Sequence, residues 1–116
     1  MISTKAGSQS GVSLFFCEVK MFFKKKIQRR RYRFYGEVQA VGFRWTALTT
    51  ARRCGATGWV KNEPDESVSM ELQGTARQID HVLAALHADD YIRIERTEEA
   101  AAAVLQNEKD FCVRYE

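Results

Sequence analysis

The chain has 116 residues, 45% of them hydrophobic, which is enough for one domain with a buried core and too few for two ordinary domains. Its net charge of +3 is divided unevenly. Residues 1–33 hold nine Lys or Arg and one acid, a balance of +8, while the remaining nine basic residues face fourteen acids, a balance of −5. The longest apolar runs are far shorter than the roughly 18 residues of a membrane-spanning helix, and Glu18 and Lys20 interrupt the stretch where a secretory signal would be continuous.

Three widely spaced cysteines without a CxxC pair indicate neither a disulfide framework nor a zinc site, and they fit a reducing cytoplasm. The basic character gathers in KKKIQRRRYR, residues 24–33. We interpret residues 1–28 as a basic, poorly ordered leader and residues 29–116 as the domain. A solvated run is the simpler interpretation, and contact with nucleic acid or another anionic surface is the alternative.

Apolar and polar residues alternate over residues 31–38, which predicts a first strand with Tyr32, Phe34 and Val38 on one face. The apolar spacing then becomes helical over residues 43–54, where Gly55 follows as a left-handed end. These two patterns predict a strand followed directly by a helix.

The next segments predict a hairpin and a second helix. Residues 56–62 and 67–73 read as two strands joined by a turn at Pro64 and Asp65. Thr75 stands three positions before Gln78, as in a capping box, and apolar residues then recur at helical spacing.

Two short strands complete the predicted elements, over residues 91–96 and 111–115, with Phe111, Val113 and Tyr115 on one side of the last. The Ala- and acid-rich residues 98–109 are expected to form a connector with a short helix. The order strand, helix, strand, strand, helix, strand is the split βαβ plan of an α+β fold. It predicts an antiparallel sheet of four to five strands with two helices on one face.

The loop between the first strand and first helix offers an anion site. Amides at the start of a helix lack intrahelical partners, and the helix dipole adds positive potential there. Glycines allow a backbone to approach a ligand closely, and an arginine supplies a fork that matches phosphate oxygens. The candidate phosphate-binding loop comprises Gln39, Ala40, Val41, Gly42, Phe43 and Arg44.

The runs YGEVQAVGFR (35–44), GWVKNEPDESV (58–68) and FCVRY (111–115) resemble the acylphosphatase family over residues 31–116. The resemblance implies a ferredoxin-like sandwich that hydrolyses small acyl phosphates to a carboxylate and inorganic phosphate, without metal or cofactor. It also implies that Arg44 binds the phosphate and that Asn62 orients the attacking water. A cytoplasmic monomer with no membrane partner is expected.

The chemistry of such a reaction agrees with these two residues. The leaving carboxylate has a conjugate acid with a pKa of roughly 4, so its departure needs no general acid. What remains is to stabilise charge on the phosphoryl group and to place one water in line with the leaving oxygen. Arg44 with the loop amides serves the first need, and the Asn62 amide serves the second.

Two residues depart from the family pattern and open an alternative. Ala40 and Glu66 occupy positions where the family usually has glycine, so a left-handed dihedral at Ala40 would strain the loop. The alternative is a catalytically weakened phosphate-binding or regulatory module.

Other chemically suggestive residues favour no further site. His81 and His87 lie on different faces of the second predicted helix, and each is expected to be at the surface or partly buried. Cys54 and Cys112 fall on apolar stripes and are expected to be small core residues. Trp59 is expected in the core or at its rim, because the aromatic pattern of RNA-binding sheets is absent from the sequence.

Overall fold

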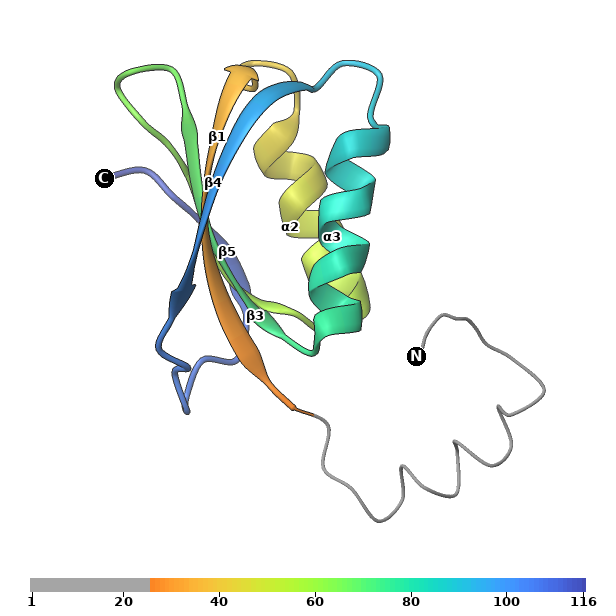
Figure 1. The fold of residues 1–116 in the computed structure, drawn as a ribbon, viewed down its shortest axis with the longest axis vertical. Coiled ribbons are helices and arrows are strands. Elements are labelled where there is room, and N and C mark those ends of the chain that lie inside the picture. The colour runs from red at the N-terminus through yellow and green to blue at the C-terminus, as the bar shows by residue number, and fades with distance from the viewer. Residues whose placement is uncertain (1–25) are drawn as a thin grey trace, which may run out of the picture.

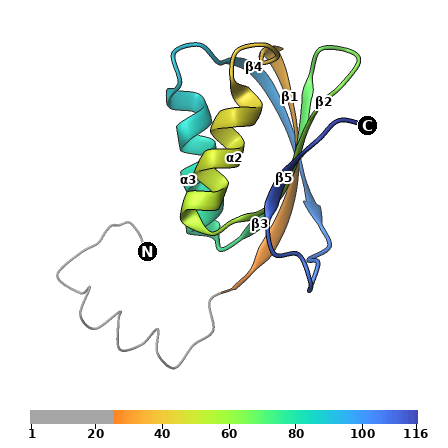
Figure 2. The same cartoon turned by 180° about the vertical axis from the view of Figure 1, so that it is seen from behind.

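The computed structural model describes residues 26–116, in which two helices cover one face of a five-stranded sheet (Figures 1 and 2). The elements, in chain order, are β1 (Gln28–Glu37), α2 (Phe43–Cys54), β2 (Thr57–Asn62), β3 (Val68–Gly74), α3 (Ala76–Ala88), β4 (Arg93–Ala102) and β5 (Phe111–Arg114). The strand order β4-β1-β3-β2-β5 confirms the predicted split βαβ plan with both helices on the same face.

The local signals for both helices are confirmed. Helix α2 ends at Gly55, whose φ of 85° is left-handed and whose amide donates to the Ala51 carbonyl. Helix α3 begins with the capping box, in which the Thr75 hydroxyl accepts from the Gln78 amide and the Gln78 side chain accepts from the Thr75 amide. These caps satisfy groups that a helix end otherwise leaves unpaired.

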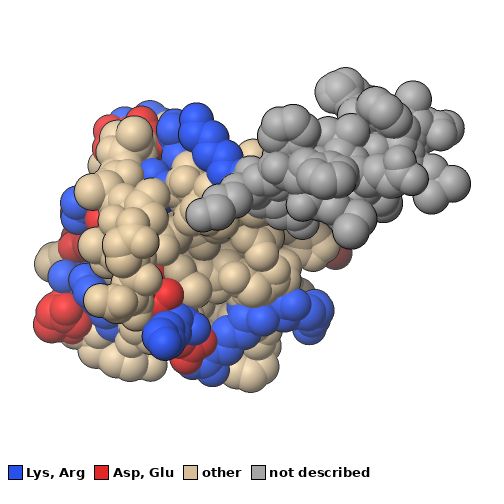
Figure 3. Space-filling view, turned by 90° about the horizontal axis from the view of Figure 1, so that it is seen from below, with Lys and Arg blue, Asp and Glu red and all other residues tan. Residues whose placement is uncertain are grey.

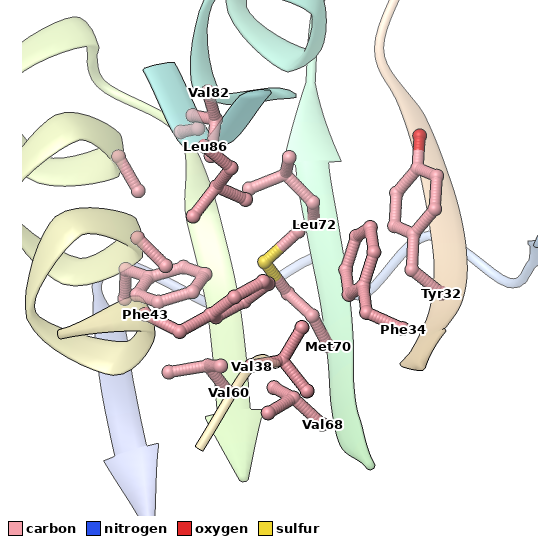
Figure 4. Packing of buried hydrophobic residues seen from close by; sticks show 14 of the residues in the cluster. Tyr32, Phe34, Val38, Phe43, Val60, Val68, Met70, Leu72, Val82 and Leu86 are labelled. Carbon is pink, nitrogen blue, oxygen red and sulfur yellow. The ribbon is translucent and has the colours of Figure 1, made fainter. Parts of the chain in front are cut away.

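The core lies between the helices and the inner face of the sheet (Figure 4). The fully or almost fully buried side chains shown there come from β1, the loop after it, β2, β3 and both helices: Tyr32, Phe34, Val38, Phe43, Val60, Val68, Met70, Leu72, Val82 and Leu86. The alternation predicted for the first strand and the hairpin therefore points the apolar face inward. No helix among residues 26–116 is long and apolar enough to cross a membrane.

The sheet differs from the prediction at β5. This strand pairs with β2 in parallel, while the remaining pairs are antiparallel, so the sheet is mixed. Phe111 points inward and is buried, but Cys112 is exposed, so its expected place in the core is wrong. Tyr115 lies beyond the last strand residue and is exposed.

The predicted connector over residues 98–109 begins too early and contains no helix, because β4 continues to Ala102 and residues 103–110 connect it to β5. The ten residues of β1 present backbone donors and acceptors along their whole length, and β4 pairs with them from Glu37↔Arg93 to Arg29↔Ala102. A side-chain ion pair between Arg30 and Glu99, at 2.7 Å, joins the two strands.

The basic run over residues 24–33 continues into the sheet, since β1 begins at Gln28, three residues before the start of the predicted first strand. The Arg29 side chain is 1% exposed, and its guanidinium lies 2.6 Å from the Glu71 carboxylate and 2.7 Å from that of Glu108. Burial alone would lower the pKa of Arg29, but its hydrogen bonds to Glu108 and Glu71 outweigh burial and raise this pKa above its ordinary value. The interpretation of this residue as solvated is therefore wrong.

Basic and acidic side chains lie next to one another on the face of the molecule seen in Figure 3. Arg31 lies 3.3 Å from Glu71, and Arg33 lies 3.2 Å from Asp65. The arginines of β1 are thus largely neutralised within the domain. The rest of the predicted leader, residues 1–25, lies outside the described residues.

Candidate functional site

The loop before α2 turns through two left-handed residues. Ala40 has a φ of 61° and Gly42, the N-cap residue, a φ of 88°. No side chain hydrogen-bonds to the first amides of α2 as a cap. The start of the helix therefore presents backbone donors and a positive dipole end to whatever lies in front of it.

Gln39 and Val41 support this loop from behind. The Gln39 side-chain amide donates to the carbonyls of Glu63 and Ser67, at 2.8 Å each, and so ties the loop to the β2–β3 hairpin. Val41 packs against the hydrophobic core. These two members of the predicted phosphate-binding loop fix its position, and neither lines the cavity described next.

A cavity of about 390 Å³ lies in front of the loop and brings the other predicted site residues together. Its lining includes Ala40, Gly42, Phe43 and Arg44 from the loop and helix start, and Asn62 from the end of β2. The remaining lining residues are Val38, Trp45, Leu48, Val113 and Tyr115.

Arg44 is available to a ligand in this cavity. Its guanidinium forms no ion pair with any acidic residue in the described part of the chain, in contrast to Arg29 and Arg33. The guanidinium carbon lies 5.5 Å from the centre of the Tyr115 ring, within cation–π range. The ring restrains the side chain without neutralising its charge.

Asn62 has hydrogen-bonding capacity left unused by the protein. Its backbone pairs with Val68 across the hairpin, which holds the residue at the end of β2. Its side-chain Oδ1 is buried, and no donor within residues 26–116 hydrogen-bonds to it. A buried acceptor without a partner costs roughly 1 to 3 kcal/mol, and a polar molecule bound in the adjoining cavity would remove that cost.

The two departures from the family pattern are left-handed. Ala40 and Glu66, with φ values of 61° and 75°, are the only non-glycine residues with positive φ in the described region. Hydrogen bonds from the Ser67 hydroxyl and amide, assisted by Arg33, hold the hairpin turn and keep the pKa of Asp65 below its ordinary value. Contacts of adjacent residues thus hold Ala40 and Glu66 in a backbone conformation that glycine would adopt without strain.

The sequence interpretation missed the apolar half of the cavity. Trp45 directly follows Arg44. Its side chain is 69% exposed, although it is large and aromatic, and it lines the cavity. Leu48 lies one helical turn further on, whereas Val113 and Tyr115 reach the cavity from β5 and the segment after it.

Residues considered for metal binding do not converge. In the stretch that the structure describes, no three His, Cys, Asp or Glu side chains are placed to hold a metal ion. His81 and His87 are both exposed, as expected from their positions on α3.

A sequence model of the acylphosphatase family matches residues 30–113, so the chain belongs to this family. An acylphosphatase of Bordetella parapertussis is 52% identical over 48 residues, which are 41% of this chain and 51% of that protein. One from Thermococcus kodakarensis is 39% identical over 59 residues, which are 51% of this chain and 65% of that protein. The matches therefore span about half to just under two thirds of these curated relatives.

Solved structures agree on the fold. The crystal structure of an acylphosphatase from Bacillus subtilis superposes with a TM-score of 0.69 at 23% sequence identity. The superposition covers 78% of this chain and 100% of that one. The fold is thus the ferredoxin-like α+β sandwich that the family resemblance implied.

Proposed function

We propose that the protein hydrolyses acyl phosphates to a carboxylate and inorganic phosphate. Membership of the acylphosphatase family supports the reaction class. The observation that carries the proposal is that one cavity joins an arginine without an acidic partner, a left-handed loop at a helix start, and the side chain of Asn62.

In this proposal, Arg44 and the loop amides bind the phosphoryl group. A guanidinium donates two parallel hydrogen bonds to phosphate oxygens, and the amides at the start of α2 add further donors. Charge on the phosphoryl oxygens is stabilised by donors already in place before the reaction begins. Gln39 holds the loop in this arrangement through its two hydrogen bonds to the hairpin.

Asn62 then positions the water. A water that donates a hydrogen bond to the Asn62 side-chain oxygen keeps a lone pair free to attack phosphorus in line with the leaving carboxylate oxygen. The bond from water oxygen to phosphorus forms as the bond from phosphorus to the acyl oxygen breaks. The carboxylate leaves without protonation because its conjugate acid has a pKa of roughly 4, and both protons of the water remain on the inorganic phosphate, which is released as H2PO4⁻.

The experiment is benzoyl phosphate hydrolysis in the presence of a chelator. We expect turnover by the wild type, and a loss of about 100-fold or more in kcat/KM for both Arg44→Lys and Asn62→Ala. Arg53→Lys and Asn107→Ala are matched controls at exposed positions outside the cavity, and they should retain activity. Absence of turnover in the wild type, or undiminished turnover in Asn62→Ala, would overturn the proposal.

The left-handed Ala40 favours a second candidate, a phosphate-binding module with weak turnover. Ala40 lines the cavity and has a left-handed backbone that glycine would adopt without strain. Calorimetry with inorganic phosphate would then show binding while benzoyl phosphate is hydrolysed poorly, and Ala40→Gly with Glu66→Gly would increase the rate. Efficient hydrolysis by the unmodified chain would reject this candidate.

A further inference from the structure

The cavity has two chemically different halves. One half contains the loop, Arg44 and Asn62, which supply charge and hydrogen-bonding groups. The other half is walled by side chains that are apolar or aromatic: Val38, Leu48, Val113, Trp45 and Tyr115. No acidic residue and no second basic residue lines it.

Two aromatic rings stand at the mouth of the apolar half. Trp45 is 69% exposed and Tyr115 is 82% exposed, although both side chains are large enough to be expected in the interior. Their elements differ, since Trp45 is on α2 and Tyr115 follows β5, so the fold brings two segments that are far apart in the chain to the same cavity. An exposed aromatic pair at a cavity is typical of a ligand-binding surface.

The position of this wall relative to Arg44 decides what it contacts. Trp45 is the next residue after Arg44, and Leu48 is one turn along the same helix. Because Arg44, Trp45 and Leu48 line the same cavity, a phosphate held by Arg44 places the group bonded to it within reach of the apolar half. The cavity volume of about 390 Å³ falls in the usual range of small-molecule sites, roughly 300 to 1,000 Å³.

We infer that this wall is an acyl subsite that selects acyl phosphates with an apolar, planar acyl group, such as an aryl group, over small or charged ones. The inference rests on the proposed function, because it assigns the acyl half of that same substrate. A flat apolar group is desolvated against the Trp45 ring, Leu48 and Val113. A carboxylate on the acyl group would lose water against Leu48 and Val113 and would find no cationic side chain in this half to compensate its charge.

The test compares benzoyl phosphate with acetyl phosphate, which share the phosphoryl group and differ in the acyl group. The wild type should favour benzoyl phosphate in kcat/KM. In Trp45→Ala the ratio of the two kcat/KM values should fall by about 5- to 10-fold, chiefly through a higher KM for benzoyl phosphate, because the contact exists equally in the ground and transition states. Trp45→Phe should restore most of the ratio.

Two controls separate this role from a structural one. Tyr91→Ala removes another exposed aromatic side chain, one that does not line the cavity, and should leave the ratio unchanged. Competitive inhibition by inorganic phosphate should persist in Trp45→Ala, because the phosphate contacts remain. An unchanged ratio in Trp45→Ala, with both substrates hydrolysed, would overturn the acyl subsite and leave the proposed function standing. A wild type that hydrolyses neither substrate would overturn both.

Discussion

The left-handed alanine in the phosphate loop makes an unusual prediction, namely that Ala40→Gly stabilises the protein. Ala40 has a φ of 61° and is exposed, so the substitution removes little buried surface. Glycine adopts this region of backbone space freely, whereas the Cβ of alanine is crowded there. The substitution should therefore relieve strain in the native state.

Two opposing terms set the magnitude. A non-glycine residue in the left-handed region is disfavoured by roughly 1 to 2 kcal/mol. Glycine adds conformational freedom to the unfolded chain, which opposes the gain by roughly 0.5 to 1 kcal/mol. The difference predicts that the free energy of unfolding rises by about 0.5 to 1 kcal/mol for Ala40→Gly.

Urea unfolding followed by circular dichroism measures this change as a shift in midpoint at constant slope. Ala84→Gly is the matched control, because Ala84 is exposed in the middle of α3, where glycine should destabilise by about 1 kcal/mol. The two substitutions are chemically identical and should change stability in opposite directions. A loss of stability in Ala40→Gly comparable to that in Ala84→Gly would refute the reasoning.

Three further substitutions test the turn at Glu66, the buried Arg29 and the buried Tyr32. Glu66→Gly, at a φ of 75°, should also raise the urea midpoint, and an unchanged or lower midpoint would contradict the strain assigned to it. Arg29→Ala should lower the free energy of unfolding by roughly 3 to 5 kcal/mol, because it leaves two partly buried carboxylates without their cation. Arg30→Ala, which breaks an exposed ion pair, should lower it by about 1 kcal/mol or less. Equal effects of the two substitutions would contradict the burial assigned to Arg29. Burial raises the pKa of Tyr32 to about 12 from 10.0, so its stabilising contribution is complete below pH 10 and is lost as the pH rises toward 12. Between pH 9 and pH 11, wild type should therefore lose on the order of 1 kcal/mol more stability than Tyr32→Phe in paired urea titrations, and parallel pH profiles would contradict it.

Short-range patterns predicted most of the secondary structure. The helix over residues 43–54 and its glycine end, the capping box at Thr75 and the hairpin strands all appear where expected. These features depend on contacts within a few residues of one another, so local periodicity contains the information that determines them.

The wrong predictions concern residues whose structure depends on partners far away in the sequence. Residues 98–102 are acidic and alanine-rich, a composition with a helical preference, yet they form strand because β1 offers ten residues of backbone to pair with. Arg29 looks like part of a charged tail until Glu71 and Glu108 are seen to enclose it. Such pairings join residues far apart in the chain, and no window of the sequence contains both partners.

The residues of the candidate site also differ in whether the sequence alone could predict them. Arg44 and the loop could be proposed from a strand-to-helix junction with glycines, and Asn62 only from the family resemblance. The apolar half of the cavity could not be proposed at all. The strand pattern predicts that Tyr115 shares a side with Val113, but no local pattern shows that this side borders the cavity beside Arg44.

The central claim is that Arg44 holds the phosphoryl group while Asn62 acts on the water, and calorimetric titration with inorganic phosphate tests it most directly. We predict that the wild type and Asn62→Ala bind phosphate with similar affinity, although Asn62→Ala has lost turnover. Arg44→Lys should bind phosphate far more weakly, because a point charge does not reproduce the planar fork of the guanidinium. Phosphate binding by Arg44→Lys with the affinity of the wild type would contradict the account.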